Sequence, residues 1–166
     1  TESQEGRNVG LTYFRERGFT DATIEKFGLG YSPGGYSTFS KAALEAGFKE
    51  EFLTGTGLAY KRDDGKLVDR FAERVMFPIH TVSGRVLAFG GRTLKTEKTI
   101  AKYKNSPESE IYQKKMTLYG LFFAKKAIQQ QNYAIMVEGY TDVISMHQSG
   151  VENVVASSGT SLTTEQ

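Results

Sequence analysis

Residues 133–156 have the sequence YAIMVEGYTDVISMHQSGVENVVA, which decides the fold of the end of the chain. Two apolar runs, Tyr133–Val137 and Val151–Ala156, flank a segment whose apolar residues recur at helical spacing and which ends at Gly150. A strand, a helix and a second strand in so short a stretch predict a parallel pair with a right-handed crossover. We therefore expect two buried strands and a helix over Thr141–Gln148.

Upstream of this unit the hydrophobic period changes to two, and two tight-turn signals interrupt it. These are Asp64-Gly65 and Ser83-Gly84, which are typical of β-hairpins because they tolerate positive φ. The strands expected around them are 58–61, 66–71, 74–82 and 85–92. Pro78 cannot donate to a strand ladder and predicts an edge or a bulge. Residues 93–117 lose the period, and we expect a long basic loop there.

Helical spacing dominates the beginning of the chain and returns after the basic loop. Glycines stand where helices of this kind end, at Gly18, Gly28 and Gly47, and Thr20 has the character of a helix N-cap. The helices expected are 9–17, 21–27, 38–46 and 118–131, with a brief strand at 28–31. The sequence therefore predicts an α+β part followed by an α/β part.

Composition excludes several classes of protein. The 166 residues suit one domain or slightly more, and the absence of cysteine excludes disulfides, thiolate zinc sites and cysteine nucleophiles. No apolar run approaches the ~20 residues that a membrane span needs, and no secretory signal is present. We expect a soluble intracellular protein without a membrane partner.

The net charge of +2 hides an uneven distribution of charged side chains. Residues 61–126 carry 15 basic and 7 acidic side chains, whereas residues 127–166 carry 4 carboxylates and neither lysine nor arginine. A basic middle beside an acidic end is typical of a protein that handles a polyanion and holds a metal. A solvated basic surface explains the charge equally well.

Two carboxylates are the candidates for metal binding. Glu138 follows a predicted parallel strand at its carboxyl end, where α/β sheets bind ligands, and Asp142 falls in the first turn of the next helix. Such oxygen ligands suit Mg²⁺. The alternative is that Asp142 only complements the helix dipole and Glu138 is an exposed strand-end acid.

Basic and aromatic residues in the middle of the chain are the candidates for nucleic-acid binding. A strand period of two places Arg70 and Arg74 on one face, and Arg92 follows the open backbone of Gly90-Gly91. The run from Lys102 to Ser106 mixes cations with an aromatic ring, as phosphate contact and base stacking require. Local pairs, such as Glu73 with its neighbour Arg74, are the alternative.

Common catalytic motifs are absent from the sequence, including the phosphate-binding P-loop, the nucleophile elbow and the zinc-binding helix H-E-x-x-H. His80 and His147 are expected to be satisfied structural histidines rather than ligands. Gly159-Thr160-Ser161 is expected to be an ordinary loop.

Five motifs together resemble a known family. They are DRFAERVMFPI (69–79), FGGR (89–92), KYKNSPE (102–108), LYG (118–120) and VEGYTDV (137–143). In this order and spacing they resemble the RNA polymerase domain of bacterial replicative DNA primases of the DnaG type, from about Tyr13 to the last residue. The element around Glu138 alone is also similar to the toprim module of topoisomerases and recombination proteins.

The resemblance implies a division of the chain into three parts. Residues 1–118 would form the α+β N-terminal subdomain of a primase catalytic core, residues 119–132 a connecting helix, and residues 133–166 the first part of an α/β, parallel-sheet toprim subdomain. We expect a piece cut at both ends, without the family's zinc-binding and helicase-binding domains. Such a piece would hold only part of the metal site and would be inactive alone.

The resemblance also implies roles for particular residues. Glu138 would ligate catalytic Mg²⁺ or Mn²⁺ and is a candidate for proton transfer, with Asp142 as its acidic companion; no zinc is expected in these residues. The implied nucleic-acid and nucleotide-binding residues are Arg17, Arg70, Arg74, Arg92, Lys102, Tyr103, Lys104, Asn105 and Lys114. Ala72 stands where the family commonly has a third arginine, so it is not expected to bind.

The activity implied is the synthesis of short RNA primers, in which a primer 3′-hydroxyl attacks the α-phosphate of a ribonucleotide. The implied partners are single-stranded DNA template, ribonucleoside triphosphates, the RNA primer, the replicative helicase and single-strand-binding protein, in the cytoplasm at the replication fork. One alternative is a non-catalytic module that binds single-stranded nucleic acid. Another is a toprim protein of the topoisomerase or recombination type, which would need a nucleophilic tyrosine and leaves the 70–108 motifs unexplained.

Overall fold

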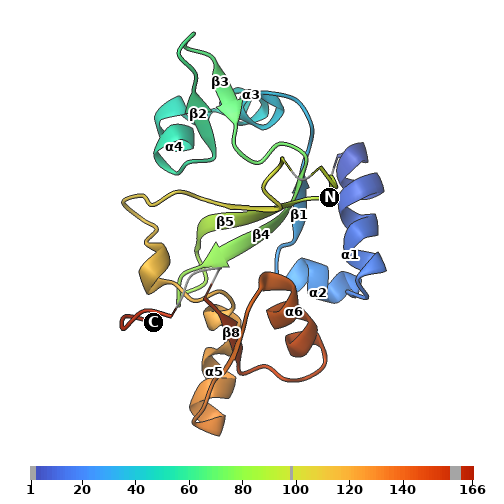
Figure 1. Cartoon of the computed structure of the whole chain (residues 1–166), viewed down its shortest axis with the longest axis vertical. Coiled ribbons are helices and arrows are strands. Elements are labelled where there is room, and N and C mark those ends of the chain that lie inside the picture. Colours follow the sequence, from blue (N-terminus) through green and yellow to red (C-terminus); the bar gives the residue numbers. More distant parts are fainter. Residues whose placement is uncertain (1–2, 98, 158–161) are drawn as a thin grey trace.

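The computed structural model describes residues 3–97, 99–157 and 162–166, and its centre is a four-stranded antiparallel sheet in the order β1-β4-β5-β6. The strands of this sheet are β1 (Gly30–Ser32), β4 (Arg74–His80), β5 (Val86–Thr93) and β6 (Tyr103–Asn105). Figure 1 shows the sheet between a small module of helices and strands at one end of the long axis and the C-terminal helices at the other.

The hairpin predicted at Ser83-Gly84 is confirmed. Strand β4 pairs with β5 throughout, and Gly84 has a φ of 96°, which a side chain would strain. Strand β1 pairs only with Arg74–Met76, so β4 has a single neighbour at Pro78, and the register shifts just beyond it, between Ile79 and His80. The edge and the bulge that Pro78 predicts are both present.

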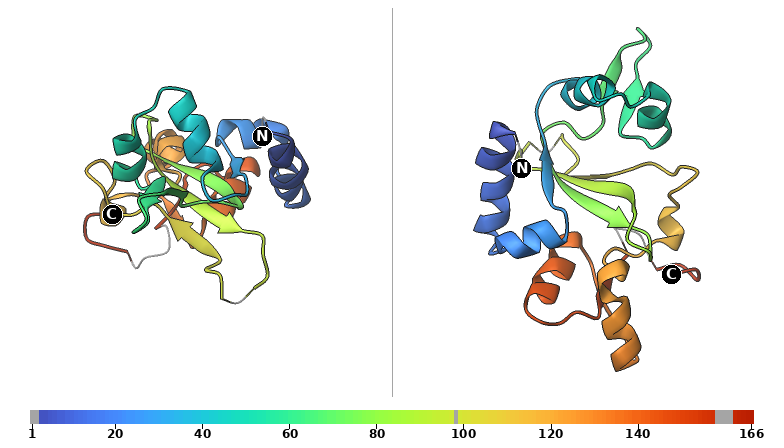
Figure 2. Two further views of the ribbon diagram at one scale, coloured as in Figure 1. Left: turned by 90° about the horizontal axis from the view of Figure 1, so that it is seen from above. Right: turned by 180° about the vertical axis from the view of Figure 1, so that it is seen from behind.

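Helices lie beside β1, in the two segments, 9–17 and 21–27, where the sequence predicts helices. They are η1 (Gly6–Leu11), a π-helical segment that continues into α1 (Thr12–Glu16), and α2 (Asp21–Lys26). The Thr20 side chain accepts a hydrogen bond from Thr23 N and caps α2, as expected. Figure 2 shows these helices beside β1 from two further directions.

The small module contains α3 (Thr38–Glu45), α4 (Glu50–Gly55), β2 (Ala59–Lys61) and β3 (Leu67–Asp69). Strands β2 and β3 form the hairpin predicted at Asp64-Gly65, with a φ of 79° at Gly65. Helix α4 was not predicted, because its single buried apolar residue, Leu53, gives no helical period. Ala43, Leu53 and Ala59 form a hydrophobic cluster of their own.

Two expectations for the middle of the chain are wrong. Residues 70–73 form a turn rather than a continuation of the strand, and Glu73 has a φ of 56°. The basic segment 93–117 is not one loop, since β6 lies within it and pairs with β5, and the short 3-10 helix η2 (Lys114–Met116) follows. Both errors arise because pairing between distant segments, rather than the local period, fixes these conformations.

The end of the chain confirms the predicted α/β unit. It contains α5 (Leu121–Gln131), β7 (Ile135–Val137), α6 (Tyr140–Gln148) and β8 (Val154–Ala156). Strands β7 and β8 pair in parallel, in the register Ile135 to Val154. The loop expected at Gly159–Ser161 lies outside the described residues.

Two details of this unit differ from the prediction. Strand β7 is half-exposed rather than buried, whereas β8, which packs against α5 and α6, is fully buried. Helix α5 begins at Leu121 rather than 118, because Gly120 has a left-handed φ of 85° and the backbone of Tyr119 bonds to Ala156 instead.

One continuous hydrophobic core joins the sheet to the C-terminal unit. It runs from Phe14 through Val75 and Phe77 to Val143 and Val154, all of which are fully buried. This core crosses the predicted boundary at residue 118, and the division into three parts stays a prediction. In the part of the chain that the structure describes, every helix is too short or too polar to cross a membrane.

Asp69 at the end of β3 holds the small module together. Its buried carboxylate accepts hydrogen bonds from Phe39 N at 2.7 Å, from Ser40 N at 2.9 Å and from the Ser40 hydroxyl. These donors lie in the first turn of α3, whose N–H groups have no partner within the helix. Asp69 therefore caps α3 from a neighbouring strand.

Replacing Asp69 with alanine should lower the free energy of unfolding by about 3 kcal/mol, because buried donors lose a charged acceptor. Asp69→Asn should cost less, since its amide oxygen still accepts. Urea denaturation followed by circular dichroism measures both. The exposed Asp63→Ala serves as the control and should change stability by less than about 0.5 kcal/mol. Equal stability of Asp69→Ala and the control would contradict the capping role.

Candidate nucleic-acid and metal site

Tyr140, the first residue of α6, fixes the position of the two candidate carboxylates. Its side chain is 4% exposed, and its ring stacks on Phe77 with 5.2 Å between ring centroids. Its hydroxyl donates to Asn105 Oδ1 at 2.8 Å. A Cβ atom at Gly90 would lie 2.4 Å from this ring, so only glycine allows the contact. The start of α6 is thereby held against β5 and β6.

Gly90 and Gly91 were expected to permit close approach, and both do so to rings of the protein itself. Tyr140 lies against Gly90 on one face of the sheet, while a Cβ atom at Gly91 would lie 2.6 Å from the Phe71 ring. The open backbone before Arg92 therefore serves packing.

Glu138 and Asp142 lie in one pocket of about 600 Å³ together with basic and polar residues from the middle of the chain. Glu138 directly follows the carboxyl end of β7, and both carboxylates are exposed. The same pocket is lined by Tyr103, Asn105, Ser106 and Lys114. We call this the carboxylate pocket. It brings together the candidate metal ligands and candidate nucleic-acid-binding residues, which α5 and β7 separate in the sequence.

The alternative role of Asp142 is also present. Its Oδ2 atom accepts a hydrogen bond from Gly139 N at 3.1 Å at the beginning of α6. This bond orients the carboxylate and leaves it at the wall of the carboxylate pocket. Stabilisation of the helix end and an outward-facing acid are therefore compatible.

The donor set of the carboxylate pocket suits a hard divalent cation with few protein ligands. Mg²⁺ is commonly held by one or two carboxylates, with water and phosphate oxygens as its other ligands. Among the described residues, no group of three or more His, Cys, Asp and Glu side chains could hold a metal. Glu138 and Asp142 fit a magnesium site that a phosphate group completes.

Arg92 and Arg17 flank the ring of Tyr13. Their guanidinium carbons lie 5.0 and 5.3 Å from the ring centroid, and Arg92 Nη1 donates to the Tyr13 hydroxyl. Arg92 Nε is buried and has no hydrogen-bond partner within the described structure. Burial raises the pKa of Tyr13, so it stays a neutral phenol. Tyr13 lies 79 positions from Arg92, so no local pattern in the sequence predicts their contact.

The sheet divides the predicted basic residues between its two faces. In the register of β5 and β6, Arg92 lies opposite Tyr103 and Gly91 opposite Lys104. Opposed residues share a face and successive residues alternate, so Tyr103 and Lys104 point to opposite faces. Arg92, Tyr103 and Asn105 share the face that Tyr140 covers. The single basic run at 102–105 therefore serves two different sites.

The opposite face carries a second pocket of about 420 Å³, in which four cations, Arg70, Arg74, Lys95 and Lys104, outnumber two acidic residues, Asp69 and Glu73. We call it the basic pocket. Burial lowers the pKa of Lys104, and the neighbouring Arg74 and Arg70 lower it further. Arg70 and Arg74 were predicted to share a strand face; the strand is absent at Arg70, yet both residues line this pocket.

Arg74 is occupied by structural contacts. It is only 3% exposed, and its guanidinium donates to the carbonyl oxygens of Gly91, Ala101 and Lys102 at 2.9–3.3 Å. These bonds hold the segment between β5 and β6 in place. Arg70 Nε similarly donates to Asn105 O at 3.3 Å. Nucleic-acid binding by Arg74 stays a prediction.

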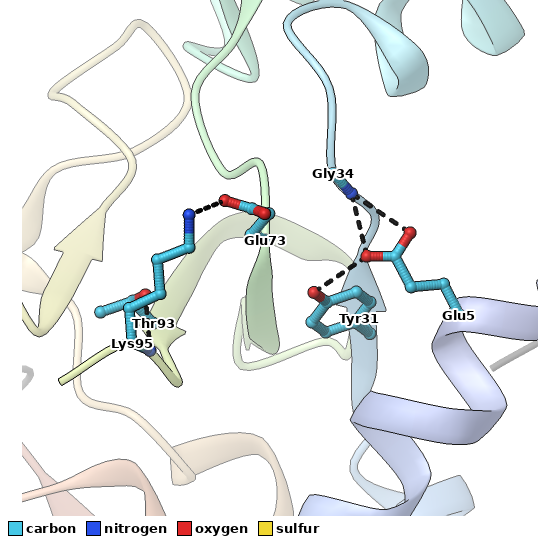
Figure 3. A network of polar contacts seen from close by, with 6 residues as sticks. All are labelled: Glu5, Tyr31, Gly34, Glu73, Thr93 and Lys95. Carbon is cyan, nitrogen blue, oxygen red and sulfur yellow. Dashed lines mark hydrogen bonds and ion pairs between the residues drawn. The ribbon is translucent and has the colours of Figure 1, made fainter.

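Two carboxylates beside the basic pocket also have structural partners, as Figure 3 shows. Glu73 pairs with Lys95 at 2.5 Å. The alternative raised by the sequence was a pair between Glu73 and its neighbour Arg74. Glu5 accepts from the Tyr31 hydroxyl and from Gly34 N, both at 3.2 Å. Burial and Glu5 raise the pKa of Tyr31 to about 12.

Three further residues, Lys102, His80 and His147, do not line the carboxylate pocket. Lys102 is exposed, and its carbonyl oxygen accepts from Thr93 N. His80 packs on the ring of Phe122 and His147 on that of Phe27, and burial lowers the pKa of both. Their expected structural character agrees with these contacts.

Comparison with known proteins was consistent along the whole chain. Residues 1–125 match the family described as the DNA primase catalytic core, N-terminal domain, and residues 132–166 match the Toprim domain. A DNA primase of Halalkalibacterium halodurans is 44% identical over 165 residues, which are 99% of this chain and 27% of that protein.

Solved structures agree with the sequence matches. The RNA polymerase domain of Mycobacterium tuberculosis primase DnaG is 39% identical, with a TM-score of 0.90 over 99% of this chain and 53% of that one. The same domain in complex with a double-stranded DNA oligomer with a 6-nucleotide overhang is 38% identical, also with a TM-score of 0.90, over 99% of this chain and 51% of that one.

The chain spans about a quarter of the length of the curated relatives it matches and about half of the solved chains. The family match nevertheless covers most of its residues, and it agrees with the order of the motifs and with the observed fold. The chain belongs to the DNA primase catalytic core family.

Proposed function

We propose that the complete protein is a DNA-directed RNA polymerase that synthesises short RNA primers on single-stranded DNA by metal-dependent nucleotidyl transfer. The observation that carries this proposal is the carboxylate pocket, which Glu138 and Asp142 line together with Tyr103, Asn105 and Lys114. Joining nucleotides requires carboxylates that hold a metal cation and basic side chains that hold phosphate groups. They come from two segments, 103–114 and 138–142, that α5 and β7 separate in the sequence.

Glu138 and Asp142 would hold Mg²⁺ or Mn²⁺ in this pocket. When bound, the cation would neutralise charge on a nucleoside triphosphate. Lys114 stands across the pocket and is suited to bind phosphate oxygens. Tyr103 is partly exposed in the same pocket, so its ring is available for stacking on a base. Glu138 is also the candidate to take a proton from the attacking hydroxyl.

Arg92 and Arg17 extend this surface beyond the carboxylate pocket. The ring of Tyr13 between them orients both guanidinium groups, and the buried Nε of Arg92 lacks an acceptor in the described structure. The part of the Arg92 side chain that is accessible is suited to contact a phosphate oxygen of the template or the nucleotide. The M. tuberculosis domain in complex with a DNA oligomer supports the assignment of DNA as a ligand.

We further propose the partners that the resemblance to primases implies. They are the single-stranded DNA template, ribonucleoside triphosphates, the RNA primer, the replicative helicase and single-strand-binding protein, in the cytoplasm. Lys102, Lys104 and Arg70 add positive charge along the template path on the other face of the sheet.

Glu138→Gln in the complete protein should reduce single-turnover dinucleotide synthesis about 100-fold or more, because the substitution removes a charge at the reacting centre while keeping its shape. DNA binding should stay near the wild-type level. Fluorescence anisotropy with labelled DNA measures binding alongside the synthesis assay.

Glu165→Gln is the matched control, since Glu165 is exposed and lies outside the carboxylate pocket. Near-normal synthesis by Glu138→Gln would contradict the proposed role. If the wild-type protein bound DNA but synthesised no dinucleotide, that result would instead favour a non-catalytic nucleic-acid-binding module.

Arg92→Ala should weaken binding of single-stranded DNA and lower the slope of log affinity against log salt by about 0.7, the share of one phosphate contact. Titrations at several salt concentrations measure this slope. Arg85→Ala removes an exposed arginine at the far end of the same hairpin and should leave the slope unchanged. Identical slopes for the two variants would show that Arg92 makes no phosphate contact.

A further inference from the structure

The side-chain amide of Gln166 bridges two segments that lie far apart in the sequence. Its Nε2 atom donates to Lys114 O at 3.2 Å and to Thr117 O at 3.0 Å, so each of its two N–H groups has an acceptor. Its Oε1 atom accepts from Thr163 N at 3.3 Å. One amide therefore joins the turn at 163–166 to η2, whose first residue, Lys114, lines the carboxylate pocket.

The turn at 163–166 makes a further contact with η2. Gln166 N donates to Thr163 O at 3.2 Å and closes the turn, and the Thr163 hydroxyl donates to Lys115 O at 2.6 Å. The last carbonyl groups of a helix have no partner within it. At the end of η2, the carbonyl oxygens of Lys115 and Thr117 obtain their donors from this turn. A distant part of the chain thus caps η2.

Lys114 is also held from its other side. Its backbone N–H donates to Glu108 Oε1 at 3.0 Å, while its carbonyl oxygen accepts from Gln166. The backbone is therefore fixed in both directions, and the half-buried side chain lies at the wall of the carboxylate pocket. A lysine ammonium ends a flexible four-carbon stem. Fixing the backbone of Lys114 limits the positions that this ammonium can reach.

We propose that Gln166 is a positioning residue that holds Lys114 in place for a nucleoside triphosphate in the carboxylate pocket. This inference rests on the proposed function, in which Lys114 binds phosphate oxygens. Without the Gln166 amide, η2 loses two hydrogen bonds and the Lys114 ammonium samples a wider range of positions. More conformational freedom is then lost when the ammonium binds phosphate, so the affinity for nucleotide falls. Glu138 and Asp142 lie on another segment, and the chemical step should change little.

Steady-state dinucleotide synthesis by the complete protein, over a range of ribonucleotide concentrations, tests this role. Gln166→Ala should raise the KM for the incoming nucleotide about 10-fold and leave kcat within about twofold, because it weakens binding before the reaction. Gln166→Glu keeps the acceptor for Thr163 N but places an oxygen against two carbonyl groups, so it should raise KM at least as much. In a Lys114→Ala background, Gln166→Ala should change KM by less than about twofold, since the two residues act as one unit.

Gln148→Ala is the matched control. The Gln148 amide makes the same kind of bridge elsewhere, since it accepts from Thr20 N at 2.9 Å and donates to Gly18 O at 2.8 Å. Neither Gln148 nor its partners line the carboxylate pocket, so its loss should leave KM unchanged. An equal rise in KM for Gln148→Ala and Gln166→Ala would indicate a general loss of stability and would overturn the positioning role.

Equilibrium binding of fluorescently labelled ATP with Mg²⁺ repeats the comparison without synthesis, and Gln166→Ala should raise the Kd about 10-fold only when Lys114 is present. Wild-type affinity in Gln166→Ala and Gln166→Glu, or equal losses with and without Lys114, would overturn the positioning role. Coupled losses of ATP binding in a protein whose wild type makes no dinucleotide would support the role and overturn the proposed function. Absence of both ATP binding and synthesis in the wild type would overturn both.

Discussion

The contact between Tyr140 and Gly90 is the constraint on which the rest of the candidate site depends. Tyr140 follows Glu138 and Gly139 at the beginning of α6, so its position determines where both carboxylates lie. Its ring can lie flat against the antiparallel sheet only because Gly90 has no side chain. The hydrogen bond from its hydroxyl to Asn105 then fixes the edge strand β6 at the same place. One buried side chain thus aligns the acidic and the basic parts of the molecule.

Positive charge in the middle of the chain has two distinct uses. Arg74 is buried, and its guanidinium donates hydrogen bonds to three carbonyl oxygens. These bonds hold the residues just before β6 in place. Arg92, on the other face, rests on the ring of Tyr13 and keeps a buried N–H without an acceptor. The three hydrogen bonds of Arg74 stabilise the fold, whereas the Arg92 side chain is partly accessible and lies on the face of the carboxylate pocket. Counting basic residues along the sequence cannot separate these two uses.

Local chemistry explains which features were predictable from the sequence. The two hairpins and the parallel unit follow from turn residues and from hydrophobic period, and all three are present. The hydrophobic period also predicts that Glu138 lies at the end of a strand. The short strand β6 was missed because its polar residues take their conformation from pairing with β5, far away in the sequence.

For the same physical reason, the sequence could not predict that neighbouring residues of β6 lie on opposite faces of the sheet. Once β6 pairs with β5, the register sends Tyr103 to the carboxylate pocket and Lys104 to the basic pocket. Tyr13 was likewise overlooked, since its importance lies in what folding places beside it. A contact of Tyr13 with Arg92 has no local signature in the sequence.

The central claim is that a cation held by Glu138 and Asp142 faces β6 and Lys114 across one pocket. Fe²⁺ bound in place of Mg²⁺ reduces added hydrogen peroxide to hydroxide and a hydroxyl radical, ascorbate returns the Fe³⁺ to Fe²⁺, and the radicals cut the backbone close to the metal. Mapping the cuts in the complete protein tests the claim directly. The account predicts cuts at residues 138–142 together with cuts at 103–106 and near Lys114, all suppressed by excess Mg²⁺. Cuts confined to residues 138–142, with none in the 103–114 segment, would contradict it.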